Sequence, residues 1–397
     1  MTAAVENGAI RMDAPRDGVR TRLVAIDALR GLVMLIMLLD HIRETVFLHH
    51  QVGDPVDAAS VDPALFFTRL LSTLCAPIFV ALTGLSAWLY GQSHSPRETS
   101  LFLLKRGLFL IVLELTLVSF AWSAQFPPRT VWLQVIWAIG ISMLALSALI
   151  HLPRTARIAL GLVIVCGHNL LDGIVLAPGD TGFPLWAMLH QRAVIELGGG
   201  AIAKTTYPVL PWIGVILLGH AIGPWFGGGS RCDPARRSRR LLLLGAGMLA
   251  AFLVLRLPDL YGDRSWQAGP DGLRTLIAVL ALTKYPPSLL FLLATLGPGA
   301  LLLALFTRGK DSRVLGWLAV IGGAPMFFYL LHLYVLRALY LGAVALFGLN
   351  QGSVYGVESV ATLWLWFLLL LVPLSIPTAW FARLKQRRRD LRWLKYL

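Results

Sequence analysis

The sequence predicts an all-α polytopic membrane protein, a transmembrane helix bundle of about ten helices with both termini on the cytoplasmic side. Three observations lead to this fold class. Hydrophobic residues make up 57% of the 397-residue chain and charged residues only 14%, which is too apolar for a soluble domain of that length. Apolar runs of about 20 residues, the length that crosses a bilayer, recur along the chain. Lys and Arg cluster in alternate connections between these runs, as the positive-inside rule requires.

The apolar runs divide the chain into one domain and two short tails. The stretch 1–22 is polar and lacks both an apolar signal-peptide core and a cleavage site, so we expect a disordered cytoplasmic N-terminal tail. Residues 384–397 are expected to form a basic cytoplasmic C-terminal tail, and the transmembrane domain spans 23–383. Its predicted helices lie at 23–47, 64–91, 101–121, 130–151, 155–177, 207–226, 239–257, 284–307, 320–348 and 358–383.

The charges of the connections give the orientation. The predicted cytoplasmic connections contain Arg97, Lys105 and Arg106, then Arg154 and Arg157, then the stretch 231–240, and then Arg308, Lys310 and Arg313. The outer connections contain Asp54, Asp57, Asp62, Asp259, Asp263 and Asp271. Two outer segments, 178–206 and 258–283, are longer than a simple turn needs. Each is expected to be either the mouth of a polar-ligand site or an interfacial structural segment.

The composition excludes several other classes of protein. The net charge is +14, but the basic residues lie in short clusters between apolar runs, so nucleic-acid binding is not expected. Cys75, Cys166 and Cys232 are scattered without a CxxC pair, which indicates neither a disulfide framework nor a metal site. The sequence has no GxSxG elbow, Walker A loop or HExxH motif.

The first predicted helix carries more ionisable groups than membrane anchoring requires. Asp27 and Arg30 lie near one end, and near the other lie Asp40, His41, Arg43 and Glu44. Charged groups in hydrocarbon cost about 2.5 kcal/mol each or more, so they indicate a functional site. Arg30 and His41 are 11 residues apart, which at about 100° per residue places them on nearly the same helix face, about 16 Å apart along the axis.

This stripe suits a protein that takes an anionic cofactor from one side and performs base chemistry toward the other. Arginine binds phosphate through a planar, permanently charged fork, and histidine is matched to proton transfer near neutral pH. The alternative is that the Asp27–Arg30 and Asp40–Arg43 pairs are helix-end ion pairs and that His41 is a packing residue.

An Arg and a His separated by ten residues on the first transmembrane helix resemble the motif of the acyltransferase-3 class of membrane acyltransferases. More specifically, the chain resembles the bacterial proteins grouped with the catalytic domain of heparan-alpha-glucosaminide N-acetyltransferase, the DUF1624 group. The matching stretches are 25–43, 66–90, 207–223, 284–298 and 322–336.

The resemblance implies an enzyme of the bacterial inner membrane that passes an acetyl group from cytoplasmic acetyl-CoA to an amine or hydroxyl at the outer face. An envelope sugar or glycolipid is the expected acceptor, and the chain is either monomeric or a homodimer. His41 is expected to be the catalytic histidine, supported by Asp40 or Glu44, with Arg30 and Asp27 nearer the cofactor. The heparan enzyme's active histidine lies further on, where this chain offers His49 and His50. A proton-coupled or small-molecule transporter is the rival interpretation, because the same stripe could relay protons.

Six further residues are candidates for contact with the substrate, and most have a structural alternative. They are Arg43, Arg69, Tyr207, Trp212, Lys284 and His332. Arg69 could instead be an interfacial anchor, Trp212 an aromatic-belt residue and His332 a packing residue.

Two other features also have a functional and a structural interpretation. Cys75 is more readily explained as a buried apolar residue than as an acyl-carrying thiol. His168 and Asp172 lie four residues apart and could orient an imidazole or mark a solvated helix end.

Overall fold

The computed structural model describes residues 17–227, 233–309, 312–388, 390–391 and 394, with side chains from residue 24 onward. Most of the expected N-terminal tail, together with Cys232 and Lys310, lies outside the described residues. The first helix already begins at Asp17, six residues before the predicted start of the transmembrane domain. The division into a domain and two tails stays a prediction.

The described chain is mostly helical, as predicted. The elements in its first half are α1 (Asp17–Val46), α2 (Pro63–Ser72), α3 (Cys75–Gly91), α4 (Pro96–Leu113), the π-helix η1 (Glu114–Val118), α5 (Ser119–Ser123), β1 (Thr130–Leu133), α6 (Val135–Leu149), α7 (Arg154–Gly167), the 3₁₀-helix η2 (His168–Leu171), α8 (Phe183–Leu189), β2 (Val194–Gly198) and β3 (Ala201–Thr205). The second half contains α9 (Leu210–Ala221), the 3₁₀-helix η3 (Gly223–Phe226), α10 (Pro234–Arg256), α11 (Gly272–Leu280), α12 (Leu289–Arg308), α13 (Arg313–Gly322), α14 (Pro325–Phe347) and α15 (Val360–Arg387).

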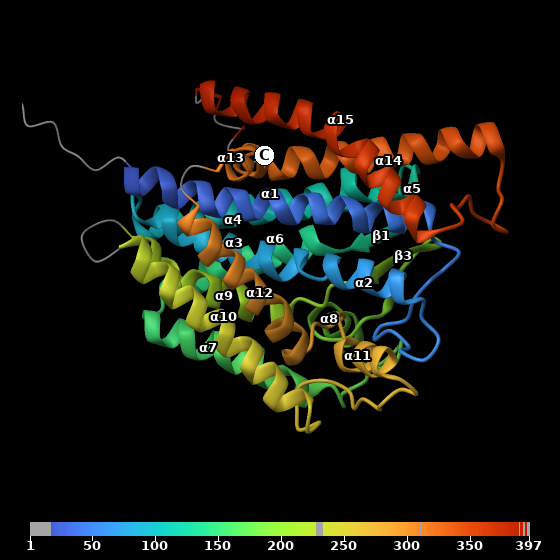
Figure 1. The fold of residues 1–397 in the computed structure, drawn as a ribbon, viewed down its shortest axis with the longest axis horizontal. Coiled ribbons are helices and arrows are strands. Elements are labelled where there is room, and N and C mark those ends of the chain that lie inside the picture. Colours follow the sequence, from blue (N-terminus) through green and yellow to red (C-terminus); the bar gives the residue numbers. More distant parts are fainter. Residues whose placement is uncertain (1–16, 228–232, 310–311, 389, 392–393, 395–397) are drawn as a thin grey trace, which may run out of the picture.

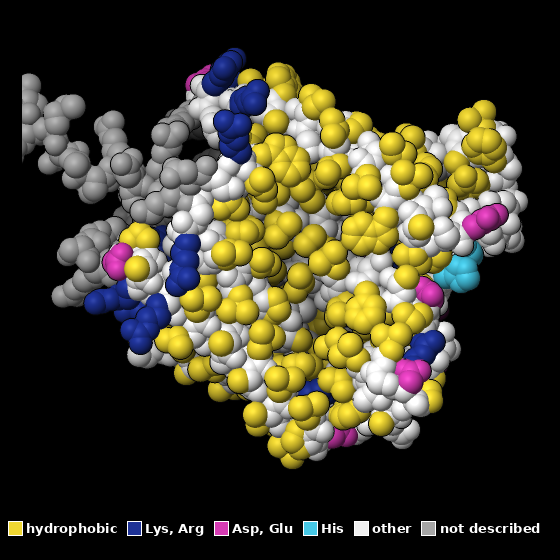
Figure 2. Space-filling model, viewed as in Figure 1, with side chains coloured by type: hydrophobic (Ala, Val, Ile, Leu, Met, Phe, Trp, Pro, Cys, Tyr) yellow, Lys and Arg dark blue, Asp and Glu magenta, His cyan; other side chains and the backbone are white. Residues whose placement is uncertain are grey.

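Among the described residues, five helical segments are long and apolar enough to cross a membrane. They are Pro63–Gly91, which joins α2 and α3, and the helices α10, α12, α14 and α15. Helix α1 is 30 residues long but carries the charges that singled it out in the sequence. The outer surface supports a membrane location, because large apolar side chains such as Val163, Leu243, Leu346 and Leu369 are more than 60% exposed. In Figure 2 most visible Lys and Arg side chains gather at one end of the molecule, with a broad hydrophobic surface beside them.

Helix α1 runs through the middle of the helix packing, against α2, α3, α12, α13, α14 and α15 (Figure 1). Its crossing with α13 is the closest approach. A Cβ atom on Gly31 would lie 2.0 Å from the carbonyl oxygen of Leu318, and one on Gly322 would lie 1.9 Å from that of Asp27. A second crossing of this kind joins α3 to α9 at Gly84 and Gly219. Small residues let membrane helices pack backbone against backbone, so glycine positions determine where α1 lies.

Side-chain caps and prolines set the helix starts near the site. Asp62 accepts a hydrogen bond from the backbone N–H of Leu65 at the start of α2, and Ser288 accepts one from Phe291 at the start of α12. Pro325 follows Ala324, whose backbone is not helical, so α13 and α14 are separate helices. The predicted continuous helix over 320–348 is therefore wrong at its N-terminal end.

A three-stranded sheet occupies the end of the molecule toward which α1 runs (Figure 1). Its strand order is β1-β3-β2, with β1 parallel to β3 and β2 antiparallel to β3. The hairpin between β2 and β3 turns at Gly199 and Gly200, whose positive φ angles of 61° and 78° favour glycine. The prediction of one helix over 130–151 is thus wrong at its start, since residues 130–133 pair with a strand 72 residues later. The segment 178–206, which was predicted to be an outer connection, folds as α8 and this hairpin.

Candidate active site

A cavity of about 780 Å³ lies at the C-terminal end of α1. This volume is within the range of small-molecule sites, about 300–1,000 Å³. Its walls come from the end of α1, α5, β1, β3, α14 and the connections 48–54 and 284–285. Of the residues predicted for the site, the cavity brings together Asp40, His41, Arg43, Glu44, Arg69, Tyr207 and Lys284.

The predicted candidates His41 and His332 are direct partners. Nδ1 of His41 lies 2.6 Å from Nε2 of His332, although the two residues are 291 positions apart. The rings are nearly coplanar, at 15°, with centroids 4.9 Å apart. This spacing fits an in-plane N–H···N hydrogen bond between imidazole edges. His332 is fully buried in the protein interior.

Backbone geometry fixes the proton positions of this pair when both rings are neutral. Nδ1 of His332 lies 2.7 Å from the carbonyl oxygen of Phe328, and a carbonyl only accepts, so Nδ1 carries the proton. Nε2 of His332 is then an acceptor, and Nδ1 of His41 must donate to it. Nε2 of His41 therefore keeps its lone pair. Because His41 lines the cavity, the arrangement gives the cavity a histidine base.

Two buried donors beside His41 have no hydrogen-bond partner among the described residues. They are Nε1 of Trp122 and the hydroxyl of Tyr329. The Trp122 ring meets His41 edge to face at 5.4 Å between centroids, and the Tyr329 ring at 5.8 Å. Buried polar groups are nearly always hydrogen-bonded, so unpartnered donors next to a base indicate a place for a ligand acceptor.

The rest of the cavity wall is strongly charged, with more cations than carboxylates. The cations are Arg43, Arg69, Arg192, Lys204, Lys284 and Arg337, and the carboxylates are Asp40, Glu44 and Asp54. Arg43 pairs with Asp40 at 3.1 Å and also with Glu44, and Lys284 lies 3.8 Å from Asp40. Burial alone would lower the pKa of Lys284, but Tyr285 and Asp40 raise it above its ordinary value, so the ammonium group stays charged.

Asp54 joins three segments of the cavity wall. It forms an ion pair with Arg69 at 3.4 Å and accepts hydrogen bonds from the backbone N–H groups of Lys284 and Tyr285. Burial raises the pKa of Asp54, while Arg69 and Lys284 act in the opposite direction. Arg69 is itself buried and donates to the carbonyl of Gly53 at 2.7 Å. Arg69 is thus part of the cavity wall.

Arg30 and Asp27 lie outside this cavity, nearer the other end of α1. One guanidinium nitrogen of Arg30 donates to Asp27 at 2.6 Å and to the carbonyl of Gly322 at 3.3 Å. The other donates to Ser86 at 3.0 Å. Arg30 thereby ties α1 to α3 and to the end of α13.

The structure also places the other candidates. Trp212 is fully buried against Tyr207, with ring centroids 5.6 Å apart, so it is a core residue and not part of an aromatic belt. Cys75 is buried, with its sulfur 3.2 Å from the carbonyl oxygen of Val33. His49 and His50 do not line the cavity.

Several cavity residues escaped the sequence analysis. Trp122, Arg192, Lys204 and Arg337 carry no local motif, and only the fold brings them together. Glu114 had a signal, a carboxylate inside an apolar run, but it does not line the cavity. Its Oε2 accepts from the backbone N–H of Trp137 in the first turn of α6, while its buried Oε1 has no hydrogen-bond partner among the described residues.

The sequence profile of one protein family, described as heparan-alpha-glucosaminide N-acetyltransferase, catalytic, matches residues 22–256. The match covers more than half of the chain and runs from α1 to the end of α10. The chain belongs to this family. Membership in the heparan-alpha-glucosaminide N-acetyltransferase catalytic family implies a membrane acetyltransferase. The matched region contains His41, whereas its partner His332 and the cavity residue Lys284 lie beyond it. No curated protein matches the chain.

Proposed function

We propose that this protein transfers an acetyl group from cytoplasmic acetyl-CoA to an amine or hydroxyl of a sugar or glycoconjugate bound in the cavity at the end of α1. The observation that carries the proposal is the His41–His332 pair at the wall of a large polar cavity, on a helix of an acetyltransferase family. The bacterial inner membrane is the proposed location, with the cavity open toward its outer face.

In this proposal His41 is the general base. Its Nε2 atom takes a proton from the acceptor N–H or O–H while the acceptor attacks the thioester carbonyl. The carbon–sulfur bond then breaks, and Nε2 returns the proton to the departing CoA thiolate. His332, anchored on the carbonyl of Phe328, holds the imidazole of His41 in the required tautomer. Asp40, next in sequence, favours the cationic form of His41 during the transfer.

The unpartnered donor at the cavity wall provides a further element of catalysis. The Trp122 N–H would stabilise the negative charge that develops on the thioester oxygen. Such donors are already oriented by the protein, so nothing has to rearrange when the charge develops. One donor of this kind typically contributes about 10²- to 10³-fold in rate.

The lining supports a polar acceptor that carries negative charge. Its cations outnumber its carboxylates, and Arg192 and Lys284 both lie over the ring of Tyr285, at 5.2 and 5.1 Å. A sugar amine with a sulfate, phosphate or carboxylate substituent would use both the base and this charge. In this proposal Arg30 has a positioning role in the N-terminal half of α1, which is supported by the three protein oxygens that its guanidinium contacts.

The experiment that tests the proposal is CoA-thiol release from acetyl-CoA by protein in lipid nanodiscs, where both faces are accessible. Wild type and His41→Ala are assayed with glucosamine, glucosamine 6-sulfate and glucosamine 6-phosphate. We expect release that requires an acceptor, is faster with the charged sugars and is lost in His41→Ala. Adding His332→Ala to His41→Ala should cause no further loss, because His332 acts through His41.

Proteoliposomes with one orientation then test the direction of transfer, with acetyl-CoA on one side and the acceptor on the other. Transfer from the side of the basic connections is expected. Folded protein that consumes no thioester with any of these acceptors would contradict the acetyltransferase proposal. Acceptor uptake without CoA release would establish the transporter instead.

A further inference from the structure

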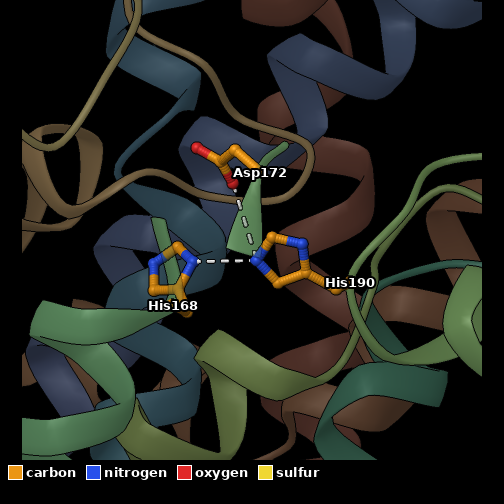
Figure 3. A group of neighbouring side chains, drawn as sticks. All are labelled: His168, Asp172 and His190. Atoms are coloured by element: carbon orange, nitrogen blue, oxygen red, sulfur yellow. Dashed lines mark hydrogen bonds and ion pairs between the residues drawn. The ribbon is translucent and has the colours of Figure 1, made fainter. Parts of the chain in front are cut away.

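Outside the cavity just described, three metal-ligating side chains converge from two segments of the chain. His168 begins η2, Asp172 follows the last residue of that turn, and His190 follows the last residue of α8. Nδ1 of His168 lies 3.3 Å from Nε2 of His190, and Oδ1 of Asp172 lies 3.6 Å from the same nitrogen. Figure 3 shows both contacts meeting at that one nitrogen of His190. All three ligand atoms lie within 4.8 Å of one another.

Hydrogen bonds alone do not satisfy this cluster. A neutral His190 has at most one proton on Nε2, and it can donate that proton either to His168 or toward Asp172. The Asp172 oxygen is also too far from Nε2, at 3.6 Å, for a good hydrogen bond. Nε2 of His190 can therefore serve only one of the two groups, whereas a cation between the three atoms would contact them all.

The two separations from His190 fit a tetrahedral metal ion. Zinc binds histidine nitrogen at about 2.0–2.1 Å and carboxylate oxygen at a similar distance, which places neighbouring tetrahedral ligand atoms about 3.3 Å apart. The observed separations from Nε2 of His190 are 3.3 and 3.6 Å. Two imidazoles and one carboxylate are a donor set that suits zinc and leaves one position open. We propose that His168, Asp172 and His190 bind a divalent transition-metal cation, with Zn²⁺ as the best match.

Neighbouring groups hold two of the three ligands, Asp172 and His190, in place. The side-chain amide of Asn169 donates to Oδ2 of Asp172 at 2.9 Å, so Oδ1 is the oxygen that faces the histidines. The same amide's oxygen accepts from the backbone N–H of Leu289 at 2.9 Å, at the start of α12. The Trp186 ring stacks on His190, with centroids 5.2 Å apart. Such contacts to metal ligands fix their orientation and raise metal affinity.

The position of the cluster provides an entry route for the cation and connects the cluster to the wall of the cavity. His168 and His190 are 2% and 3% exposed, whereas the Asp172 side chain is 50% exposed, so an ion enters from the Asp172 side. After Gln191, His190 is followed by Arg192, Ala193 and Val194, which line the acetyltransferase cavity. A bound cation would join η2 to this wall and restrict its movement.

The metal content of the purified protein tests the proposal independently of catalysis. The full chain is purified through a tag without histidine, stripped with a chelator and dialysed against micromolar Zn²⁺. Mass spectrometry of the metal should give about one equivalent in wild type and none above background in His190→Gln. His50→Gln is the matched control. His49 and His50 are also neighbours, with ring centroids 4.5 Å apart, but belong to no such three-ligand group among the described residues.

A second variant covers the case in which His190→Gln does not fold. Asp172→Asn changes only the half-exposed ligand and should weaken Zn²⁺ binding at least about tenfold. Co²⁺ in the same site should give the intense visible bands of tetrahedral coordination in wild type and His50→Gln. The proposal is overturned by folded wild-type protein that binds no metal. Equal metal content and affinity in wild type and Asp172→Asn would overturn it as well.

Discussion

The two halves of α1 carry the same kind of residues but use them differently. In its N-terminal half, the cation Arg30 donates to Asp27, Ser86 and the carbonyl of Gly322, in a crossing where the helices touch through glycine. At its C-terminal end, His41 makes one hydrogen bond to His332 and keeps a lone pair at a cavity of about 780 Å³.

The contrast separates ionisable groups with a structural role from those available for chemistry. In a bilayer a polar group must be satisfied by the protein, by water or by a ligand. Arg30 is satisfied by protein oxygens, whereas the region around His41 keeps unused hydrogen-bonding capacity at Trp122 and Tyr329. We therefore expect substitutions near Arg30 to change mainly stability and substitutions near His41 to change mainly rate.

The largest effect is expected for His41→Ala, which removes the proposed base. The kcat should fall by about 10³-fold, within the range of general acid–base catalysis, while the thermal midpoint stays near that of wild type. Acceptor-dependent CoA release and a thermal melt of the same preparation measure the two quantities. His50→Ala, an exposed histidine that does not line the cavity, serves as the control and should keep wild-type activity. A His41→Ala protein with normal kcat would contradict the distinction between structural contacts around Arg30 and chemistry around His41.

The next effect is expected for Trp122→Phe. This change keeps the aromatic ring beside His41 but removes the unpartnered N–H. If that donor stabilises the transition state, kcat should fall by about 10²-fold with little change in the KM of either substrate. Steady-state kinetics with both substrates varied provide the measurement. A rise in KM at constant kcat would instead assign Trp122 to ground-state binding.

Much of the helical architecture could be predicted because a long apolar run indicates a helix without reference to any distant part of the chain. The predicted helices 239–257, 284–307 and 358–383 correspond to α10, α12 and α15, with shifts of a few residues. The wrong prediction over 130–133 depends on a contact that is distant in the sequence. Strand β1 exists because it pairs with β3, a partner that no pattern near residue 130 reveals. The separation of α13 from α14 had a local signal, the sequence Gly-Gly-Ala-Pro over 322–325, which a hydropathy window does not register.

The candidate site was predictable where charge interrupted an apolar run. Asp40, His41 and Arg43 stood out for that reason, and they line the cavity. The pairing of His41 with His332 could not be deduced, because nothing in the spacing relates α1 to α14. Lys204 lies in β3 and Arg192 just before β2, in a segment whose charges look like those of any polar connection. Arg30 matched the motif, but its three hydrogen bonds became apparent only in the fold.

A stability effect without a catalytic effect is expected for Gly31→Ala. The new methyl group would lie 2.0 Å from the carbonyl oxygen of Leu318, a backbone atom that cannot move without shifting α13. Overpacking of this kind costs about 1–3 kcal/mol, so the thermal midpoint should fall while the folded fraction keeps its kcat. Gly316→Ala is the matched control. Gly316 lies on α13, the helix that Gly31 contacts, and no atom lies within 4 Å of its Cβ position. Equal midpoints for the two variants would show that the crossing tolerates a methyl group.

The smallest effect is expected for Arg30→Lys. This variant tests whether the motif residue Arg30 has a structural role, in contrast to His41. A lysine keeps the positive charge but cannot reach Asp27, Ser86 and Gly322 together, so about 1 kcal/mol of stability should be lost. The KM for acetyl-CoA should stay at the wild-type value, because the guanidinium is already bonded to protein oxygens. Arg97→Lys, an exposed arginine in the first turn of α4, is the control for charge and size. A raised KM at an unchanged thermal midpoint would instead place Arg30 in contact with the donor, and both ends of α1 would then take part in the reaction.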